Sequence, residues 1–380
     1  MRIGVPAEVR PGETRVAATP DTIRALLRDG RHECLVQSNA GSGAGFSDAE
    51  FEAAGAVIAP SAERVYSQSD VVLKVRGPES SERSMLRRGS VIAGLLEPSN
   101  DAGIAALAAT GATAFALEAL PRISRAQTMD VLSSQANVAG YKAVLVAANE
   151  YGRFLPMLMT AGGTVKAARV LILGAGVAGL QAIATARRLG AVVEAFDVRP
   201  AVRQEVESLG AKFVEVDMSD DERAQAQTAG GYAREMSAAY LERQATLVGE
   251  RVGAADIVIT TALVPGRPAP LLISEQMVAR MRAGSVIVDL AAEQGGNCAL
   301  TERDRVVVRH DVRVVGYTNL PALVASDASA LYARNLLNFV KLLVDTKTGG
   351  VSIDPDDEIL KATLVCSGGW PARSRDDSPA

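Results

Sequence analysis

The chain has 380 residues and a formal net charge of −4, which is enough length for two or three domains with separate cores. The acidic balance argues against nucleic-acid binding, which normally requires a basic surface. Three scattered cysteines fit neither a metal site nor a disulfide framework, so a reducing cytoplasm is expected. The N-terminus lacks the apolar core of a signal peptide, and no apolar run is long enough to predict a membrane span.

Short β-branched runs alternate with longer amphipathic patterns along the chain. Strands that alternate with helices form parallel sheets, so we predict an α/β fold with two Rossmann-like doubly wound domains, a mostly parallel sheet in each, joined by long helices. The expected strands are Arg2–Val5, Glu33–Gln37, Val71–Val75, Val91–Ala93, Thr113–Ala116, Arg169–Leu173, Val192–Phe196, Phe213–Val216, Ile257–Thr261, Val286–Leu290 and Val312–Val315. The expected helices include Pro20–Asp29, Val138–Glu150, Val177–Leu189, Ser274–Met281 and Ala322–Val344.

The domain division follows from the two longest helical patterns, which we interpret as connectors. The first domain is then discontinuous and combines residues 1–137 with 320–366, while residues 138–319 form the second. The Ser-, Arg-, Asp- and Pro-rich segment 367–380 is expected to be disordered. Two polar stretches, 39–47 and 217–231, are expected to be long loops.

A glycine loop follows the expected strand Arg169–Leu173 and opens the next helix. Its sequence runs from Gly174 through Gly176 to Gly179. The first glycine permits a tight turn, the second allows backbone amides to approach a pyrophosphate, and the third allows close helix–strand packing. The pattern predicts a dinucleotide held at a helix N-terminus. A Rossmann-like sheet without a cofactor is the alternative.

The next expected strand ends at Asp197, 23 residues after Gly174. A carboxylate at this spacing accepts a ribose hydroxyl and repels a 2′-phosphate, which favours NAD(H) over NADP(H). Arg199 leaves this choice open, because a nearby arginine can hold a 2′-phosphate. Its other interpretation is a solvated residue at a helix start.

Another polar run precedes the second half of the chain and contains Arg122, Arg125, Gln127, Asp130, Ser133 and Ser134. So many donors and acceptors between two α/β halves indicate a loop that closes over a polar ligand. Asp130 has a second interpretation as the cap of a helix that starts at Val131, and Ser134 and Arg125 are also candidates for helix capping.

Six motifs together resemble a known family. They lie at residues 10–17, 121–130, 133–141, 174–179, 260–266 and 295–298. Over residues 1 to about 345 the chain is similar to the NAD(H)-binding alpha subunit of proton-translocating NAD(P) transhydrogenases, in the form in which this soluble part is a separate subunit. The wider superfamily includes alanine dehydrogenase.

The resemblance implies a homodimer that binds NAD(H) between two Rossmann-like domains. Hydride would pass between NADH and the NADP+ held by an NADP(H)-binding beta subunit, coupled to proton translocation. Because no apolar spans follow in this chain, the membrane part is expected on other chains, including a small membrane-spanning alpha subunit. The protein is then expected to be cytoplasmic and peripheral at the inner face of the cytoplasmic membrane, with no metal.

The resemblance also implies roles for individual residues. Asp130 and Ser133 would orient the carboxamide and ring of the nicotinamide, Arg122 would hold polar groups of the cofactor, and Gln127 would face the ribose of NADP(H). The nucleotide-contacting positions would be Ile123, Ser124, Gly174, Ala175, Gly176, Val177, Gly179, Asp197, Arg199, Gly231, Tyr232, Gln244 and Leu263. Among these, Tyr232 matches a tyrosine on a mobile loop that closes over the nucleotide.

Two other functions remain open at this stage. An alanine dehydrogenase needs a proton-transfer group, and Arg15 and Lys74 resemble the substrate-binding residues of those enzymes. The stretch Ala93–Asn100, where those enzymes carry a catalytic histidine, has none, and His32 and His310 are expected on the surface. In the transhydrogenase interpretation, Arg15 and Lys74 hold structural ion pairs. A non-enzymatic NAD(H) sensor is the second alternative, although a sensor has no need of a residue that faces a second nucleotide.

Overall fold

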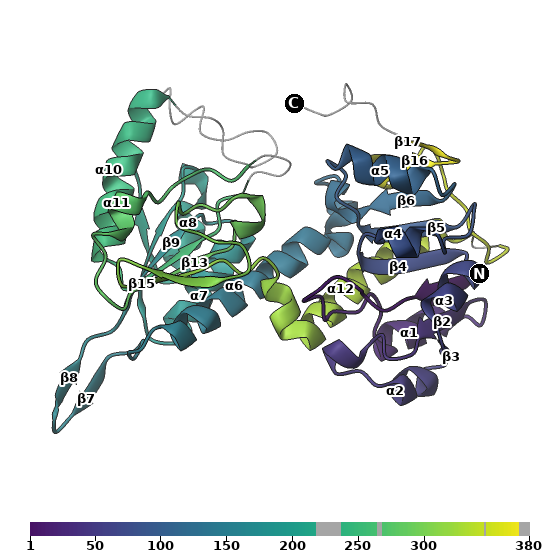
Figure 1. Cartoon of the computed structure of the whole chain (residues 1–380), viewed down its shortest axis with the longest axis horizontal. Coiled ribbons are helices and arrows are strands. Elements are labelled where there is room, and N and C mark those ends of the chain that lie inside the picture. Colours follow the sequence, from purple (N-terminus) through teal and green to yellow (C-terminus); the bar gives the residue numbers. More distant parts are fainter. Residues whose placement is uncertain (218–236, 264–267, 346, 372–380) are drawn as a thin grey trace. The chain divides into compact units, whose positions relative to one another are not determined.

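The computed structural model describes residues 1–217, 237–263, 268–345 and 347–371. The chain forms two compact units, one made of Met1–Gln135 with the described residues from Pro321 onward, the other of Ala136–Leu320. Each unit contains a mostly parallel sheet flanked by helices (Figure 1). The predicted fold class is therefore confirmed.

The first unit contains an eight-stranded sheet in the order β17-β16-β6-β5-β4-β1-β2-β3. Its six parallel strands follow the 3-2-1-4-5-6 order of doubly wound folds, with the switch point between β1 and β4. The strands are β1 Arg2–Val5, β2 Glu33–Gln37, β3 Val57–Ala59, β4 Val71–Arg76, β5 Val91–Leu95, β6 Thr113–Ala116, β16 Leu364–Ser367 and β17 Trp370–Pro371. The helices are α1 Pro20–Leu27, α2 Asp48–Ala53, α3 Ala62–Gln68, α4 Ser80–Arg83, α5 Asp101–Ala108, α12 Ala325–Val340 and α13 Glu358–Thr363, with 3-10 turns at η1 Ser42–Ala44, η2 Leu117–Ala119, η3 Ser124–Met129, η6 Leu320–Val324 and η7 Lys341–Leu343.

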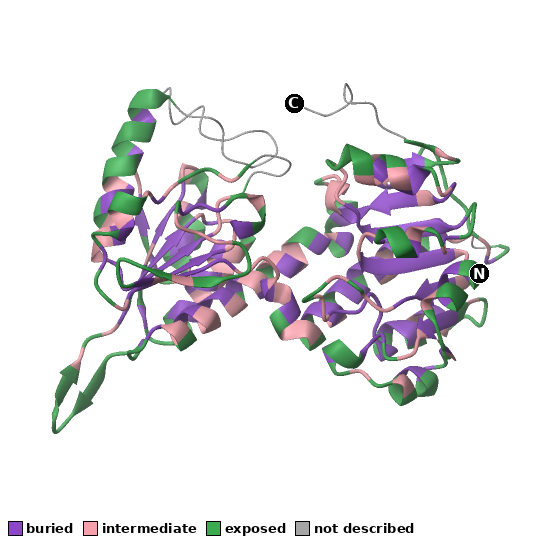
Figure 2. Cartoon of the chain, in the orientation of Figure 1, coloured by how far each residue is buried: buried purple, intermediate pink, exposed green. Residues whose placement is uncertain are grey.

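Burial explains why the strands of this unit are almost continuously apolar. Helices cover both faces of a parallel sheet, so side chains on both faces of a strand leave water. Strand β4 is buried over Val71–Val75 and includes Lys74. Helix α12 packs on the sheet through the T-shaped contact of Phe339 with Phe115, whose ring centroids are 5.5 Å apart. Figure 2 shows the buried strands inside helices with exposed outer faces.

The second unit contains a seven-stranded sheet in the order β11-β10-β9-β12-β13-β15-β14, parallel except for β14. The strands are β9 Arg169–Leu173, β10 Val192–Phe196, β11 Lys212–Val214, β12 Ile257–Thr260, β13 Val286–Asp289, β14 Val306–Arg309 and β15 Val312–Val315. The helices are α6 Val131–Glu150, which begins in the first unit, α7 Val177–Arg188, α8 Arg203–Ser208, α10 Ala238–Ala254 and α11 Glu275–Val278, with 3-10 turns at η4 Pro200–Val202 and η5 Ala292–Gln294. A separate hairpin is formed by β7 Leu158–Thr160 and β8 Gly163–Val165.

Several sequence predictions require correction. Helix α6 begins at Val131 and not at Val138, because Asp130 caps it as described below. The prediction of disorder from Ser367 is wrong for the first residues of that segment, since the apolar run Leu364–Cys366 pairs with β6 and the chain turns back through β17. Residues 372–380 and nearly all of the expected loop 217–231 lie outside the described residues. Among the helices that the structure describes, none is long and apolar enough to cross a membrane.

Candidate functional site

The carboxyl ends of four parallel strands in the second unit lie in line. Leu173 of β9 pairs in register with Phe196 of β10 on one side and with Thr260 of β12 on the other, and Thr260 pairs with Asp289 of β13. The switch point of the sheet is therefore between β9 and β12. In open α/β sheets, ligands bind at this edge beside the switch point.

The glycine loop follows β9 at this edge, and each glycine has a different structural reason. Gly174 has φ +101°, which an L side chain rarely adopts, and a Cβ there would lie 2.6 Å from Thr261 Oγ1. A Cβ on Gly179 would lie 1.9 Å from the carbonyl oxygen of Gly174, so helix and strand approach closely. At Gly176 no heavy atom of the described residues lies within 4 Å of an added Cβ. None of the described residues therefore fills the space beside Gly176, as expected for a ligand-facing position.

Helix α7 presents its first amides beside this open space. Gly176 is its N-cap, and no side chain of the described residues caps it. Uncapped amides at a helix N-terminus favour an anion such as a pyrophosphate. Val177 is 41% exposed, while Ala175 is buried and its amide is already used. The residues present therefore fit a dinucleotide phosphate at Gly176 and Val177.

Asp197 has a different environment from the one the sequence suggests. Its Oδ2 accepts from the Ala175 amide at 2.7 Å and from Arg199 Nη2 at 2.8 Å, and its Oδ1 accepts from the Arg199 amide and Nε, both at 2.9 Å. These four bonds use about all of the acceptor positions of a carboxylate. A ribose hydroxyl can bind Asp197 only when the Arg199 side chain moves aside. The solvated interpretation of Arg199 is wrong, because its guanidinium is ion-paired.

The other predicted nucleotide contacts of this unit are Gln244, Leu263, Gly231 and Tyr232. Gln244 of α10 is 7% exposed, and its side-chain oxygen has no hydrogen-bond partner among the described residues. Helix α10 packs through Tyr240 in the same core as Leu173 and Phe196. Leu263, three residues after β12, is 37% exposed. Gly231 and Tyr232 lie outside the described residues.

The polar run of the first unit forms η3, Ser124–Met129, and the start of α6. Ala126 and Met129 are buried in the core and fix the turn, while the carbonyl of Thr128 accepts from the side chains of Asn335 and Asn338 at 2.9 and 3.2 Å. Arg122, Ser124 and Gln127 are exposed, whereas Ile123 is half-buried and packs against the core. The turn therefore presents predicted site residues on a fixed backbone.

Asp130 and Ser133 form a compact pair at the start of α6. Asp130 Oδ1 accepts from the Ser133 amide at 2.9 Å, and the Ser133 hydroxyl donates to Oδ2 at 2.5 Å. This is the N-cap geometry that the sequence left open. The Asp130 carboxylate remains accessible to a ligand while it caps the helix, since both residues of the pair are only half-buried. The role of the pair at the nicotinamide stays a prediction.

Two neighbours of the run have structural partners. Arg125 pairs with Asp357, the N-cap of α13, at 2.7 Å, which lowers the pKa of Asp357. The Ser134 hydroxyl donates to Asn335 of α12 at 2.7 Å. Both side chains therefore tie the run to the C-terminal segment.

Arg15 and Lys74 lie in a buried cluster of ion pairs at the carboxyl end of the first sheet. Arg15, which is 2% exposed, donates to both carboxylate oxygens of Glu13 at 2.8 and 2.6 Å. Lys74 is 2.6 Å from Glu82 and 3.4 Å from Glu8. Burial raises the pKa of Glu8, and the Lys74 ammonium opposes that shift. The ion pairs predicted for Arg15 and Lys74 are confirmed.

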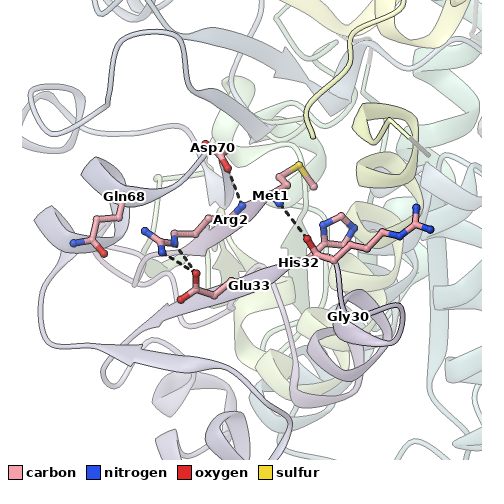
Figure 3. A pocket seen from close by; sticks show the side chains of 8 residues that line it. Met1, Arg2, Gly30, His32, Glu33, Gln68 and Asp70 are labelled. Atoms are coloured by element: carbon pink, nitrogen blue, oxygen red, sulfur yellow. Dashed lines mark hydrogen bonds and ion pairs between the residues drawn. The ribbon is translucent and has the colours of Figure 1, made fainter. Parts of the chain in front are cut away.

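The two histidines differ in exposure. His310 is on the surface, whereas the side chain of His32 is only 6% exposed and therefore less exposed than the sequence suggests, and burial lowers the pKa of His32. His32 lines a shallow polar hollow at the amino ends of β1 and β2, where Arg2 pairs with Glu33 at 2.8 Å (Figure 3). This is the end of the sheet opposite to the one where α/β folds bind ligands, and we assign it no ligand.

Two family models cover most of the chain: the alanine dehydrogenase/PNT N-terminal domain matches residues 4–139 and the C-terminal domain matches residues 143–371. The chain belongs to the alanine dehydrogenase/PNT family. It is 50% identical to the first part of the NAD(P) transhydrogenase alpha subunit of Rhodospirillum rubrum over 97% of both chains, which confirms the resemblance found in the motifs. A solved transhydrogenase from Sinorhizobium meliloti is 44% identical, with a TM-score of 0.84 and 98% of each chain covered. Alanine dehydrogenase of Mycobacterium tuberculosis is 33% identical over 91% of this chain and 88% of its own.

Sequence reasoning did not assign roles to Thr261, Asp289 or Asn297, although two of them lie in quoted motifs. All three contribute hydrogen bonds at the edge of the sheet that carries the glycine loop. Thr261 and Asp289 lie at the carboxyl ends of the expected strands Ile257–Thr261 and Val286–Leu290, which was their signal in the sequence, whereas Asn297 had no such signal. Their partners could not be read from the sequence.

Proposed function

We propose that this chain is the NAD(H)-binding component of a proton-translocating NAD(P) transhydrogenase. It would transfer hydride between NADH and the NADP+ bound on a partner subunit, coupled to proton translocation through a separate membrane subunit. The observation that carries the proposal is the 50% identity to the first part of a transhydrogenase alpha subunit along nearly the whole of both chains. The glycine loop supports it, because its open face at Gly176 fits a dinucleotide.

Binding is the first task of the chain's own residues. The amides of Gly176 and Val177 would hold the pyrophosphate, and Asp197 would accept from the adenosine ribose after Arg199 moves aside. The buried oxygen of Gln244 would gain a donor from the nucleotide or its water. When bound, NAD(H) supplies the hydride chemistry itself.

Orientation is the second task, and it falls to Arg122, Gln127, Asp130 and Ser133. Hydride exchange between two nicotinamides takes no proton from a side chain, so no general acid or base is required. Asp130 and Ser133 are hydrogen-bonded to each other in the N-cap of α6, and these bonds fix the direction of both side chains before any ligand binds. They would hold the carboxamide and ring, with Arg122 on polar groups of the cofactor and Gln127 toward the ribose of NADP(H).

A homodimer is also proposed, on the evidence of the β7–β8 hairpin. The hairpin extends away from the rest of its unit and is exposed over residues 158–164 (Figures 1 and 2). It and its approach carry exposed apolar side chains: Phe154 at 57%, Met157 at 62%, Leu158 at 39% and Met159 at 70%. Apolar surface of this kind indicates an interface, and we assign a second copy of the chain to it. Met159→Lys should lower the mass measured by sedimentation, whereas Leu271→Lys, at a similarly exposed position outside the hairpin (65% against 70%), should leave it unchanged.

The other proposed partners are an NADP(H)-binding beta subunit and a small membrane-spanning alpha subunit, at the inner face of the cytoplasmic membrane. An alanine dehydrogenase-type activity is the alternative that a 33% identical relative keeps open. The ion pairs of Arg15 with Glu13, and of Lys74 with Glu82, speak against it because both cations are neutralised inside the protein.

The test is NADH oxidation by the purified chain with and without an NADP-loaded beta subunit, next to a pyruvate-plus-ammonium control. Oxidation that depends on the NADP-loaded partner is expected. Asp130→Asn should slow this transfer at least tenfold with little change in NADH affinity. The stability of the fold should also change little, because asparagine caps a helix as well as aspartate does. Oxidation by the chain alone with pyruvate and ammonium would replace the proposal with the alanine dehydrogenase reaction, and equal losses of binding and transfer would favour a sensor.

A further inference from the structure

Two segments meet beside the glycine loop: the loop itself, after β9, and residues 261–263, after β12. The Thr261 amide donates to Leu173 O at 2.8 Å, and its hydroxyl donates to Gly174 O at 3.0 Å. A Cβ on Gly174 would lie 2.6 Å from this hydroxyl. Thr261 therefore sets the spacing between the two segments, and its hydroxyl satisfies the carbonyl at the tight turn of the glycine loop.

Asn297 holds the same segment from its other side. Its Oδ1 accepts from the Ala262 amide at 3.1 Å, and its Nδ2 donates to the carbonyls of Ala262 at 2.9 Å and Pro270 at 2.8 Å. Asn297 is completely buried. One side chain thus pairs with both main-chain groups of Ala262, in the manner of a neighbouring strand, directly before Leu263.

Asp289 fixes Asn297 in turn. This carboxylate is completely buried at the end of β13 and accepts from the amides of Asn297 and Cys298 at 2.8 and 3.1 Å. It also accepts from the hydroxyls of Thr260 at 2.8 Å and Thr301 at 2.6 Å. Several neutral donors can stabilise a buried carboxylate. The result is an unbroken hydrogen-bonded connection from β13 to the glycine loop.

We propose that Thr261 and Asn297 are positioning residues of the nucleotide site. They hold the glycine loop and the segment ending at Leu263 at a fixed separation, so that the amides of α7 and Leu263 converge on one ligand without reorganising. Pre-organisation of this kind raises affinity by removing the cost of ordering. The inference rests on the proposed NAD(H) function of the chain. Neither side chain contacts the ligand in this scheme.

The experiment is a fluorescence titration of the full chain with NADH, together with the melting temperature of each variant. Thr261→Val removes the hydroxyl at constant shape and should weaken NADH binding about tenfold, whereas Thr261→Ser, which keeps the hydroxyl, should bind within about twofold of the parent. Asn297→Asp should bind more weakly than Asn297→Ala, because it places an acceptor against two carbonyls. Thr246→Val on α10 is the matched control: its hydroxyl also donates to a carbonyl, Glu242 O at 3.0 Å, but at an exposed site.

The transfer assay with the NADP-loaded beta subunit supplies a second readout. Thr261→Val should raise KM for NADH with kcat nearly unchanged. The inference is overturned if Thr261→Val and Asn297→Ala lower the melting temperature but bind NADH like the parent chain, or if Thr261→Ser is as defective as Thr261→Val. Absence of NADH binding by the parent chain would instead refute the proposed function, and this inference with it.

Discussion

Gly140 provides a sharp test of how helix α6 supports the glycine loop. It is buried in α6, and a Cβ there would lie 2.1 Å from the carbonyl oxygen of Ala178 in the first turn of α7. Ordinary contacts begin at 3.4 Å, so Gly140→Ala brings the methyl group more than 1 Å too close to backbone that cannot rotate away. We therefore expect the two helices to move apart at this crossing.

The magnitude follows from two opposing terms. Overpacking costs about 1–3 kcal/mol, and the upper end applies because the obstacle is backbone. Alanine in a helix interior is about 0.5–1 kcal/mol better than glycine, which offsets part of that cost. The net loss is about 2 kcal/mol, or roughly 4–8 °C in the melting temperature of a unit of this size. NADH binding should weaken as well, because Ala178 is next to the amide of Val177.

Gly249→Ala is the matched control. Gly249 is also buried within a helix, but its added Cβ would lie 3.5 Å from the flexible end of Met277, which is ordinary contact. It should leave NADH affinity unchanged and raise the melting temperature slightly. Differential scanning calorimetry measures the melting temperature of both variants, and titration with NADH measures their affinity. Gly140→Ala with the stability and affinity of Gly249→Ala would refute the reasoning.

Three further predictions follow from the polar and ionisable groups. Arg199→Met should increase the preference for NADH over NADPH, because it leaves the negative charge of Asp197 uncompensated. Asp197→Asn should reduce that preference, and titrations of each variant with NADH and with NADPH measure it. Glu118 is buried, and its Oε2 has no hydrogen-bond partner among the described residues, so burial raises the pKa of this carboxyl group. Its contribution to the free energy of unfolding is therefore fully present below the ordinary pKa of 4.5 and is lost as the pH rises through the raised pKa of the folded state. Glu118→Gln should therefore raise the melting temperature at pH 8 and have little effect near pH 4.5; an equal effect at both values would contradict the argument. Burial raises the pKa of the three thiols to about 11 or 12, so native protein at pH 8 should resist iodoacetamide until it unfolds, and rapid labelling would contradict their burial.

Local pattern was sufficient for much of the fold, because the inner strands are continuous apolar runs. The bounds of Arg2–Val5, Arg169–Leu173 and Val312–Val315 agree between sequence and structure. Strands β3 and β14 were missed because they are short, partly exposed edge strands, and the hairpin of β7 and β8 was missed because it buries almost nothing. The apolar runs of β3 and β14 are only three residues long, and a run this short does not by itself identify a strand in sequence.

In the candidate site, too, local features could be predicted from the sequence and contacts between distant segments could not. The glycine spacing predicted where the loop and helix α7 lie, since each glycine acts on its own backbone. The saturation of Asp197 by Arg199 and by the Ala175 amide could not be predicted, because it depends on how the ends of β9 and β10 meet. The hydrogen bonds of Asn297 join segments 35 residues apart along the chain for the same reason.

The most direct test of the central claim is to follow the transferred atom. NADH carrying deuterium at the transferable position of the nicotinamide is mixed with this chain and an NADP-loaded beta subunit in ordinary water, and the NADPH formed is analysed by mass spectrometry. Direct hydride exchange oriented by the chain, without acid–base participation, predicts that the deuterium appears in NADPH at the label content of the donor. Unlabelled NADPH, with deuterium released to water, would contradict the account.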